Sequence, residues 1–396
     1  MTADAAGPAV LHAFRAGEWR ASLDTAALPG PPGAPYSLAL VPEIVAHADR
    51  RRWDEARDAL PPLTGRRALL LRAVELFDRG TLHIGGLGEQ GPAAFRAALW
   101  ETAGLPEPLV DRWCGMLRDG VLKRGETPAV DDALALVALP GNTFTCLDSV
   151  LEQAERSAGV WVRPSRREPL SAARLIAALL AAGWPPARVG LYPGEQHALH
   201  GLVKRTDRQI VYGGAGLAAS VRHSPALTLH GPGRGCALVP DSMPTDEAVA
   251  WLLPLVAADS GRFCSNVRTV LCATRPQSEA LASALAAALD AVPAGPGASA
   301  WPLTVFREPD TAYRALRSID DRSRPGDRLL TRREPVTGID GAPCVLPRLV
   351  HLADGDAGHP LVGHEVPFPF AAVLAATPDA VRAITADSLF VYRPAK

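Results

Sequence analysis

The segment Gly261-Arg262-Phe263-Cys264 holds the residue whose chemistry is most readily interpreted in this chain of 396 residues. Two segments precede it, Pro140-Gly141-Asn142 and Tyr212-Gly213-Gly214, and one follows it, His364-Glu365-Val366-Pro367-Phe368. A cysteine thiolate can accept an acyl group, an asparagine amide can hold an oxyanion, and a nicotinamide cofactor can deliver hydride. The four segments in this order predict an active site with a cysteine nucleophile.

Cys264 and Asn142 are predicted catalytic residues, and His230 is a third candidate. Cys264 lies in a loop between a predicted helix and a predicted strand, where a thiolate could exchange one thioester for another with little thermodynamic penalty. Asn142 follows a predicted strand, where its amide could donate to the oxyanion. Each residue also has a structural interpretation, as a buried core cysteine and as the cap of the following helix. The order of the four segments favours the catalytic one.

Two turns are predicted to bind the cofactor. Gly213 and Gly214 follow a predicted strand and open a helix, which would let backbone amides approach a pyrophosphate or a ribose. Arg163 and Ser165 follow another strand and could hold the adenosine end. The alternatives are a tight glycine turn and a solvated surface arginine.

His230 could act as an acid for the leaving thiol, but a hydrogen bond within its own turn is the favoured interpretation. His197 and His200 have helical spacing, yet no third ligand accompanies them, so no metal site is predicted.

Alternating strands and helices must position these residues. The first forty residues, rich in proline and glycine, are expected to form an irregular arm, and residues 44–122 have a helical pattern. From residue 133 short apolar runs alternate with helices of about ten residues, which predicts a parallel, doubly wound sheet. After residue 241 the pattern of helix, Cys264 loop and strand 267–272 predicts a second α/β unit. Ligands bind such sheets at the carboxyl ends of their strands.

Composition bounds the partners and the compartment. With 41 basic and 42 acidic residues the formal charge is −1, which gives no net field for nucleic acid or an anionic membrane. The amino terminus does not resemble a secretory signal, and no apolar run is long enough to cross a bilayer, so a cytoplasmic location is expected. Six cysteines without CxxC spacing predict neither a disulfide framework nor zinc.

These segments resemble the aldehyde dehydrogenase superfamily, and within it the acyl-CoA reductases typified by the fatty-acid reductase of bacterial bioluminescence. Val160-Trp161-Val162-Arg163-Pro164-Ser165 is similar to the family's Val-Val-Lys-Pro-Ser strand end, and the Cys264 loop is similar to its Gly-Gln-x-Cys nucleophile loop. Glu365 resembles the glutamate that holds the nicotinamide ribose. Hydrolytic members carry Glu-Leu-Gly-Gly-Lys, whose glutamate activates water, where this chain has Leu229-His230-Gly231-Pro232-Gly233-Arg234, similar to the Gly-Pro-Lys segment of acyl-CoA reductases.

The resemblance covers roughly residues 93–392 and implies an α/β, aldehyde-dehydrogenase-like fold with two doubly wound parallel-sheet domains and an N-terminal helical layer. Residues 1–242, completed by 366–396, would form the helical layer and the NAD(P)-binding domain, and 243–365 the catalytic domain. The activity implied is reduction of an acyl-CoA or acyl-carrier-protein thioester to an aldehyde, with NADPH or NADH, through a thioester on Cys264. A homo-oligomer is possible.

Two other functions remain open at this point. One is an aldehyde dehydrogenase working in the oxidative direction. The other is a non-catalytic binding or scaffold protein with the same fold, suggested by the short segment after Glu365 and by an arginine at position 163 in place of the family's lysine.

Overall fold

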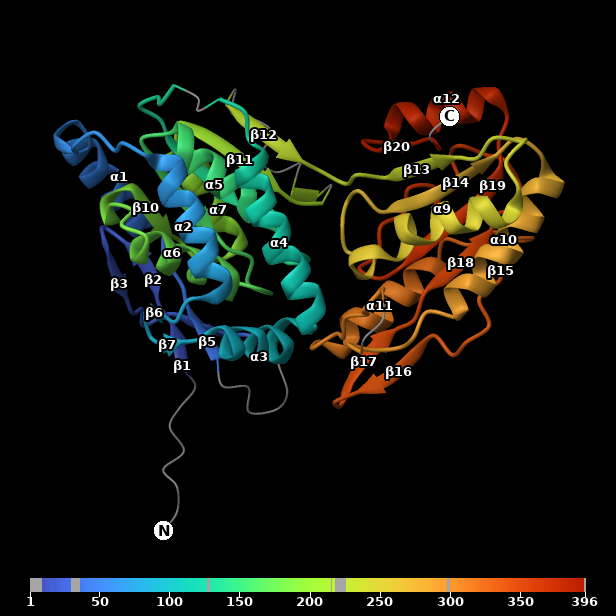
Figure 1. Cartoon of the computed structure of the whole chain (residues 1–396), viewed down its shortest axis with the longest axis horizontal. Helices are drawn as coiled ribbons and strands as arrows, with labels where there is room; N and C mark the ends of the chain where they lie inside the picture. Colours follow the sequence, from blue (N-terminus) through green and yellow to red (C-terminus); the bar gives the residue numbers. More distant parts are fainter. Residues whose placement is uncertain are drawn as a thin grey trace, which may run out of the picture. The chain divides into compact units, whose positions relative to one another are not determined.

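A computed structural model describes residues 9–29, 36–126, 129–214, 216–217, 226–297 and 300–394. Most of the proline- and glycine-rich stretch near residue 30 therefore lies outside the described residues. The chain forms two compact units, residues 1–231 and 232–396 (Figure 1). No helix in the described ranges is both long and apolar enough to cross a bilayer.

A seven-stranded sheet forms the centre of the first unit, in the order β12-β11-β8-β9-β10-β2-β3. Its parallel strands are β8 (Leu134–Ala138), β9 (Gly159–Arg163), β10 (Val189–Leu191), β11 (Arg208–Tyr212) and β12 (Leu227–His230). Every residue of β8 and β9 is buried, as expected for parallel strands covered on both faces. In the register of the sheet Tyr212 is opposite His230, and Ala138 is opposite Arg163, so the predicted site segments of this unit follow strand ends at one edge.

The amino-terminal residues add strands instead of the irregular arm expected from the sequence. Strands β2 (Ala13–Arg15) and β3 (Glu18–Arg20) extend the sheet in antiparallel fashion. A small sheet contains β1 (Ala9–Leu11), β4 (Thr25–Ala27) and β5 (Tyr36–Ala39). Burial explains the difference, because Leu11, Phe14 and Leu38 are each at most 2% exposed and so attach these short segments to the core.

Helices surround the sheet of the first unit, and the helical pattern predicted for residues 44–122 is largely confirmed. Between two of these helices the chain forms a hairpin of β6 (Leu82–Ile84) and β7 (Gly88–Gln90). A cluster of edge-to-face rings, Phe77, Phe95, Trp113 and Phe144, packs three of the helices against the turn that follows β8. The helices are α1 (Glu43–Ala56), α2 (Arg66–Arg79), α3 (Pro92–Ala103), α4 (Glu107–Lys123), α5 (Leu147–Arg156), α6 (Leu170–Ala181) and α7 (Gln196–Val203).

The second unit has its own six-stranded sheet, in the order β15-β18-β19-β14-β13-β20. All of these strands are parallel except β15 (Arg328–Leu329). The parallel strands are β13 (Gly235–Leu238), β14 (Val267–Cys272), β18 (Arg348–His351), β19 (Phe370–Ala375) and β20 (Val391–Tyr392). A hairpin of β16 (Val336–Ile339) and β17 (Ala342–Val345) completes the strands described in this unit.

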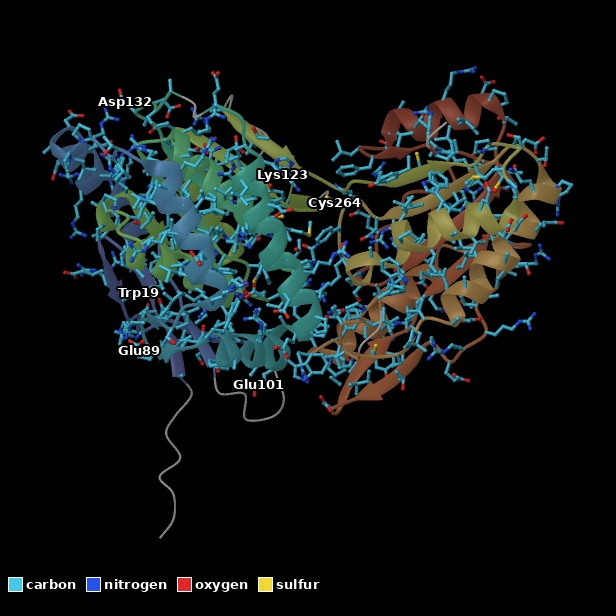
Figure 2. All side chains as sticks on the ribbon, in the orientation of Figure 1. Trp19, Glu89, Glu101, Lys123, Asp132 and Cys264 are labelled. Atoms are coloured by element: carbon cyan, nitrogen blue, oxygen red, sulfur yellow. The ribbon has the colours of Figure 1, made fainter. Side chains whose placement is uncertain are left out.

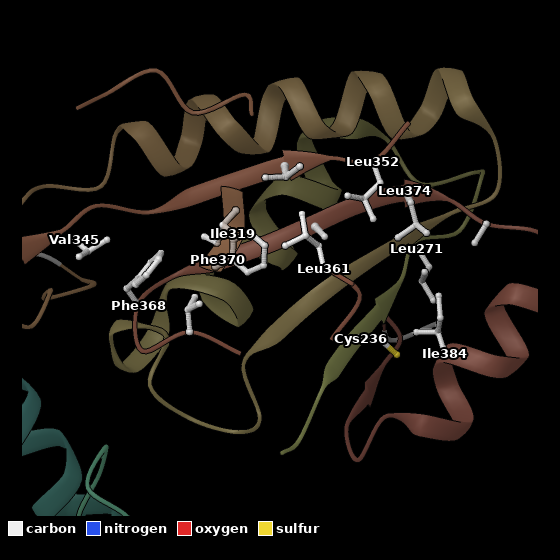
Figure 3. Close-up of a cluster of buried hydrophobic side chains, with 14 of the residues drawn as sticks. Cys236, Leu271, Ile319, Val345, Leu352, Leu361, Phe368, Phe370, Leu374 and Ile384 are labelled. Atoms are coloured by element: carbon white, nitrogen blue, oxygen red, sulfur yellow. The ribbon is translucent and has the colours of Figure 1, made fainter. Parts of the chain in front are cut away.

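Two apolar clusters cover the two faces of this sheet. Along β19 Ala371 and Val373 face the cluster formed with α9 (Thr245–Ala257) and α10 (Arg275–Asp290). The alternate residues Phe370 and Leu374 face the cluster formed with α11 (Pro309–Asp320) and α12 (Pro378–Asp387), as Figure 3 shows. This alternation is the two-residue period of a strand buried on both faces.

The observed units differ from the predicted domains in two ways. The division falls between Gly231 and Pro232 rather than at residue 242. Residues 366–396 were expected to complete the first sheet, but β19 pairs with β14 and β18, and β20 pairs with β13, all in the second sheet. The reason is that β19 is apolar on both faces, so it is placed at the centre of whichever sheet buries both, and here that is the sheet containing β14.

Candidate active site

The turn that carries Cys264 has an unusual backbone. A short turn from Ala258 to Gly261 follows α9, and Asp259, Ser260 and Gly261 have φ values of 56°, 56° and 63°. These left-handed conformations cost energy for residues with a Cβ atom. A Cβ atom on Gly261 would also lie 2.5 Å from the carbonyl carbon of Phe368, so only glycine fits where the two segments cross.

Asn266 closes the loop around Cys264. Its Oδ1 accepts a hydrogen bond from the Phe263 amide at 2.8 Å, and its Nδ2 donates to the carbonyls of Leu255 and Ala258 at 3.2 and 3.1 Å. From β20, the Tyr392 hydroxyl donates to the Ser265 carbonyl at 2.8 Å. The loop that carries Cys264 is therefore held by hydrogen bonds on both sides of this residue.

Gly233 brings Cys264 and Glu365 together within the second unit. A Cβ atom on Gly233 would lie 2.0 Å from the Cys264 carbonyl oxygen, so glycine is required for this close approach. The Gly233 amide donates to Glu365 Oε1 at 2.7 Å, and the Arg234 amide donates to the same oxygen at 3.2 Å. Two residues that sequence analysis singled out from separate motifs thus lie on either side of one glycine.

Exposure distinguishes Cys264 from the other cysteines. Cys264 is exposed (Figure 2), whereas Cys114, Cys236, Cys272 and Cys344 are buried. Burial raises the pKa of Cys114 and of Cys272 to about 12, so neither thiol is ionised near neutral pH. Solvent can therefore reach Cys264 but not these buried thiols.

Opposing influences act on the Cys264 thiol. The surrounding protein raises its pKa, and the Glu365 carboxylate raises it further. The backbone amides of Cys264 and Ser265 and the Arg268 guanidinium lower it. The net effect is a raised pKa, so the thiol is mostly protonated at neutral pH.

Arg268 is the residue of this site that sequence analysis missed. It lies in β14, is 2% exposed, and its Nη1 donates to the Phe368 carbonyl at 3.1 Å. Its Nη2 donates to the Gly261 carbonyl. The signal available in the sequence was an arginine inside a strand predicted to be buried, at residues 267–272.

In the first unit, the turns that follow β8 and β9 are in contact. A Cβ atom on Gly141 would lie 2.5 Å from Ser165 Oγ, so a larger residue there would require the Ser165 side chain to move. Asn142 follows directly and is half-buried. The predicted oxyanion residue and the predicted adenosine-binding turn therefore occupy the same edge of this sheet.

Arg163 lies beneath the loop that follows β10. It is 8% exposed, and its Nη2 donates to the Gly194 carbonyl at 3.2 Å. Burial lowers its pKa. Glu195, in the same loop, pairs with Arg166. The exposed cations at this turn are Arg166 and Arg167, and the buried Arg163 supports the loop through its hydrogen bond to Gly194.

Gly213 and Gly214 follow β11 at the same edge. The Gly213 amide donates to the His230 carbonyl at 3.1 Å. Gly214 is exposed, and a Cβ atom there would meet nothing within 4 Å, which leaves its backbone open to a ligand. The turn is thus partly structural at Gly213 and accessible at Gly214.

His230 stacks on Tyr212, with ring centroids 4.5 Å apart and planes inclined by 11°. The Tyr212 hydroxyl lies 2.7 Å from Ser149 Oγ, which fixes the ring beneath the imidazole. Burial lowers the pKa of His230, so the imidazole is neutral at pH 7 and is a poor proton donor. The stacked geometry supports the structural interpretation of this histidine.

A separate groove of about 1140 Å³ lies in the first unit between α2, α3 and α4. Its wall includes Arg96, which pairs with Asp78 at 2.8 Å and with Asp111 at 2.5 Å. None of the predicted site residues lines this groove. Acidic and basic side chains are mixed along it, so it has no consistent charge that would select a ligand.

No protein-family model and no curated protein sequence matches this chain. Solved structures do match. A NAD-dependent benzaldehyde dehydrogenase from Corynebacterium glutamicum has a TM-score of 0.79 at 15% identity, covering 98% of this chain and 89% of that one. An aldehyde dehydrogenase described as putative, from Burkholderia cenocepacia, has a TM-score of 0.77 at 18% identity, over 97% and 87%.

A third match is an NADP-dependent glyceraldehyde-3-phosphate dehydrogenase from Bacillus halodurans C-125, in complex with NADP. Its TM-score is 0.73 at 16% identity, covering 95% of this chain and 84% of that one. At such identities the likeness establishes the fold. The chain has the α/β fold of the aldehyde dehydrogenases, which confirms the predicted fold class.

Proposed function

We propose that this chain is an NAD(P)H-dependent acyl-thioester reductase that converts an acyl-CoA or an acyl-carrier-protein thioester to an aldehyde. The observation that carries the proposal is the contact of Gly233 with both the exposed Cys264 and the Glu365 carboxylate. Gly233 thereby places the candidate nucleophile, Cys264, close to Glu365, the residue that could bind the nicotinamide ribose. The aldehyde dehydrogenase fold is consistent with this use of a cysteine.

In the proposed reaction the Cys264 thiolate attacks the thioester carbonyl carbon and forms a new carbon–sulfur bond. The Asn142 amide and the Cys264 backbone N–H donate to the oxyanion that develops. The original carbon–sulfur bond then breaks, and the CoA or carrier sulfur leaves as a thiol with the proton that Cys264 lost when it ionised. Cys264 retains the acyl group as a thioester. When the aldehyde departs, Cys264 becomes a thiolate again.

The first unit offers residues that fit a dinucleotide. The Gly214 backbone is open at the carboxyl end of β11, and the Gly141–Ser165 contact leaves the turns after β8 and β9 close together. Arg163 supports the neighbouring loop, and its buried Nε has no hydrogen-bond partner among the described residues. Gly213, Gly214, Arg163 and Ser165 would hold the cofactor there, and Glu365 would orient its nicotinamide ribose. When bound, NAD(P)H supplies the hydride that reduces the acyl group.

The residue types at positions 229–234 favour reduction of the acyl group over its hydrolysis. This segment contains no carboxylate that would activate water, and His230, which lies in it, is stacked on Tyr212. Aldehyde oxidation is the second candidate, because the matched structures are described as aldehyde dehydrogenases. Oxidation to an acid would require a water-activating base that this segment does not provide.

The test is intact-protein mass after incubation with a panel of acyl-CoAs and no nicotinamide. We expect an added acyl mass on the wild type and on a control variant, Cys146→Ser, and none on Cys264→Ser. Addition of NADPH should discharge the adduct with release of aldehyde.

Conversion of aldehyde and NAD(P)⁺ to acid, with no thioester adduct, would replace the reductase with the oxidative candidate. If neither an adduct nor NAD(P)H binding is detected, the chain is a non-catalytic protein with this fold. An adduct that forms only with an acyl-carrier protein would keep the proposal and identify the donor.

A further inference from the structure

Arg268 is a buried charge in a strand inside the sheet of the second unit. It is the second residue of β14, which lies between β13 and β19 in the sheet of the second unit. Removing a guanidinium from water is costly unless its hydrogen bonds and its charge are used. A leucine or valine at this position would satisfy the core at lower cost, so the presence of arginine requires an explanation.

The contacts of Arg268 show which segments it joins. Its two terminal nitrogens donate to the carbonyl of Gly261, in the turn before Cys264, and to the carbonyl of Phe368, in the segment after Glu365. These two segments touch each other, because a Cβ atom on Gly261 would lie within 2.6 Å of Phe368 carbonyl atoms. Arg268 therefore lies beneath the point where the nucleophile turn crosses the Glu365 segment.

The electrostatic situation matches this geometry. Both acceptors of Arg268 are uncharged carbonyl oxygens, and its Nε has no partner among the described residues, so its charge is not cancelled by a directly bonded carboxylate. Burial lowers the pKa of Arg268 to about 10, and interaction with Glu365 and Cys264 opposes that lowering. The guanidinium remains charged at neutral pH and acts on both residues.

Three charged or titratable groups of the second unit act on the Cys264 sulfur. Glu365, held by the Gly233 amide, disfavours the thiolate, and Arg268 favours it. Tyr392, bonded to the Ser265 carbonyl, also interacts with Cys264. Arg268 is thus the cation that offsets the nearby carboxylate.

We propose that Arg268 is a positioning residue for the nucleophile, which fixes the crossing of the Cys264 turn and the Glu365 segment and supplies the buried positive charge that stabilises the Cys264 thiolate. The inference rests on the proposed function only in taking Cys264 as the nucleophile. It requires neither a particular acyl group nor a particular cofactor.

The experiment measures the rate of Cys264 alkylation by iodoacetamide against pH in the full-length chain, followed by intact mass with Cys264→Ala as the background. In Arg268→Gln we expect the midpoint of the profile to rise by about one pH unit, which lowers the alkylation rate at pH 7 about tenfold. Arg268→Lys keeps the charge and should retain a midpoint close to that of the wild type.

The matched control is Arg348→Gln, in β18 of the same sheet. Arg348 is buried like Arg268, with 8% of its surface exposed, and it donates to the Arg333 carbonyl at 3.0 Å. The charges that act on it are Asp290, Asp320 and Glu334, not Glu365 or Cys264. Its loss should lower stability without moving the Cys264 midpoint. If the role of Arg268 is only structural, both glutamine variants should lower stability and leave the Cys264 midpoint unchanged.

The proposal is overturned if folded Arg268→Gln has the wild-type alkylation profile, or if its midpoint moves no more than that of Arg348→Gln. If Arg268→Gln does not fold, Arg268→Lys decides, and a rise of about one pH unit there would refute the role of the charge. Because alkylation uses neither thioester nor NAD(P)H, a failed adduct experiment with an intact alkylation shift would reject only the proposed function.

Discussion

Replacing Gly261 with alanine should destabilise the second unit strongly, because two independent penalties act at this residue. The φ of Gly261 is 63°, and left-handed backbone costs an alanine about 1–2 kcal/mol. The new Cβ atom would also lie 2.5 Å from the Phe368 carbonyl carbon and from the Pro369 nitrogen, which are backbone atoms and cannot rotate away. Overpacking of this kind costs about 1–3 kcal/mol. The expected loss in free energy of unfolding is therefore about 2–5 kcal/mol.

Two other glycines of the same unit separate the two penalties. Gly341, in the turn between β16 and β17, has a φ of 73° but no atom within 4 Å of its Cβ position. Its alanine variant should lose only the backbone term, about 1–2 kcal/mol. Gly338, in β16, has neither a positive φ nor a close neighbour, so Gly338→Ala should be nearly neutral.

Urea unfolding followed by tryptophan fluorescence and circular dichroism gives the three free energies, provided that the transition of the second unit is resolved from that of the first. We expect the urea midpoint to be highest for Gly338→Ala, lower for Gly341→Ala and lowest for Gly261→Ala. A Gly261→Ala midpoint equal to that of Gly341→Ala would show that the Phe368 backbone moves aside, and would refute the assignment of Gly261 to a fixed crossing.

Three further predictions concern charge and burial. Glu365→Gln should lower the midpoint pH of Cys264 alkylation, because the carboxylate raises the pKa of that thiol; an unchanged profile would mean that the two groups are not coupled. Burial lowers the pKa of His364 from 6.5 to about 4, so the unfolded chain binds the extra proton first and stability should fall as pH decreases from about 6.5 to 4. His364→Gln should flatten that part of a curve of unfolding free energy against pH. Arg174 is 0% exposed and donates to the carbonyls of Phe77 and Gly80 at 2.6 and 2.7 Å. Arg174→Met should therefore lower the stability of the protein by about 3 kcal/mol. Thermal unfolding measures this loss, with the exposed Arg118→Met as the control.

The local sequence pattern was sufficient to predict the bounds of strands that are buried along their whole length. The strands predicted at 159–163 and 267–272 have those bounds in the structure, since a short, mainly apolar run between turn formers indicates a buried strand wherever it is placed. Short amino-terminal strands such as β2 were missed because three residues carry too little periodicity to be recognised. They form because their apolar side chains are buried in the core and a neighbouring strand presents unpaired backbone groups.

Neighbours in space that lie far apart in the chain were beyond local pattern. Gly233 donates a hydrogen bond to Glu365, 132 residues away in the sequence, and Arg268 donates one to Phe368, 100 residues away. Nothing in the composition near Arg268 identifies its acceptors. The same limit explains why β19 and β20 were assigned to the first unit, because an apolar strand does not encode which sheet will bury it.

The sequence by itself determined the α/β class, the most regular strands, and the position of Cys264 in a loop before a buried strand, because these depend on periodicity and on neighbouring residues. Only the tertiary structure decided that Cys264 is the exposed cysteine beside Glu365, that glycine is obligatory at positions 233 and 261, and that a buried arginine supports the crossing of the two segments. Those properties depend on backbones that approach within van der Waals distance and on charges removed from water, and both arise only when distant parts of the chain pack together.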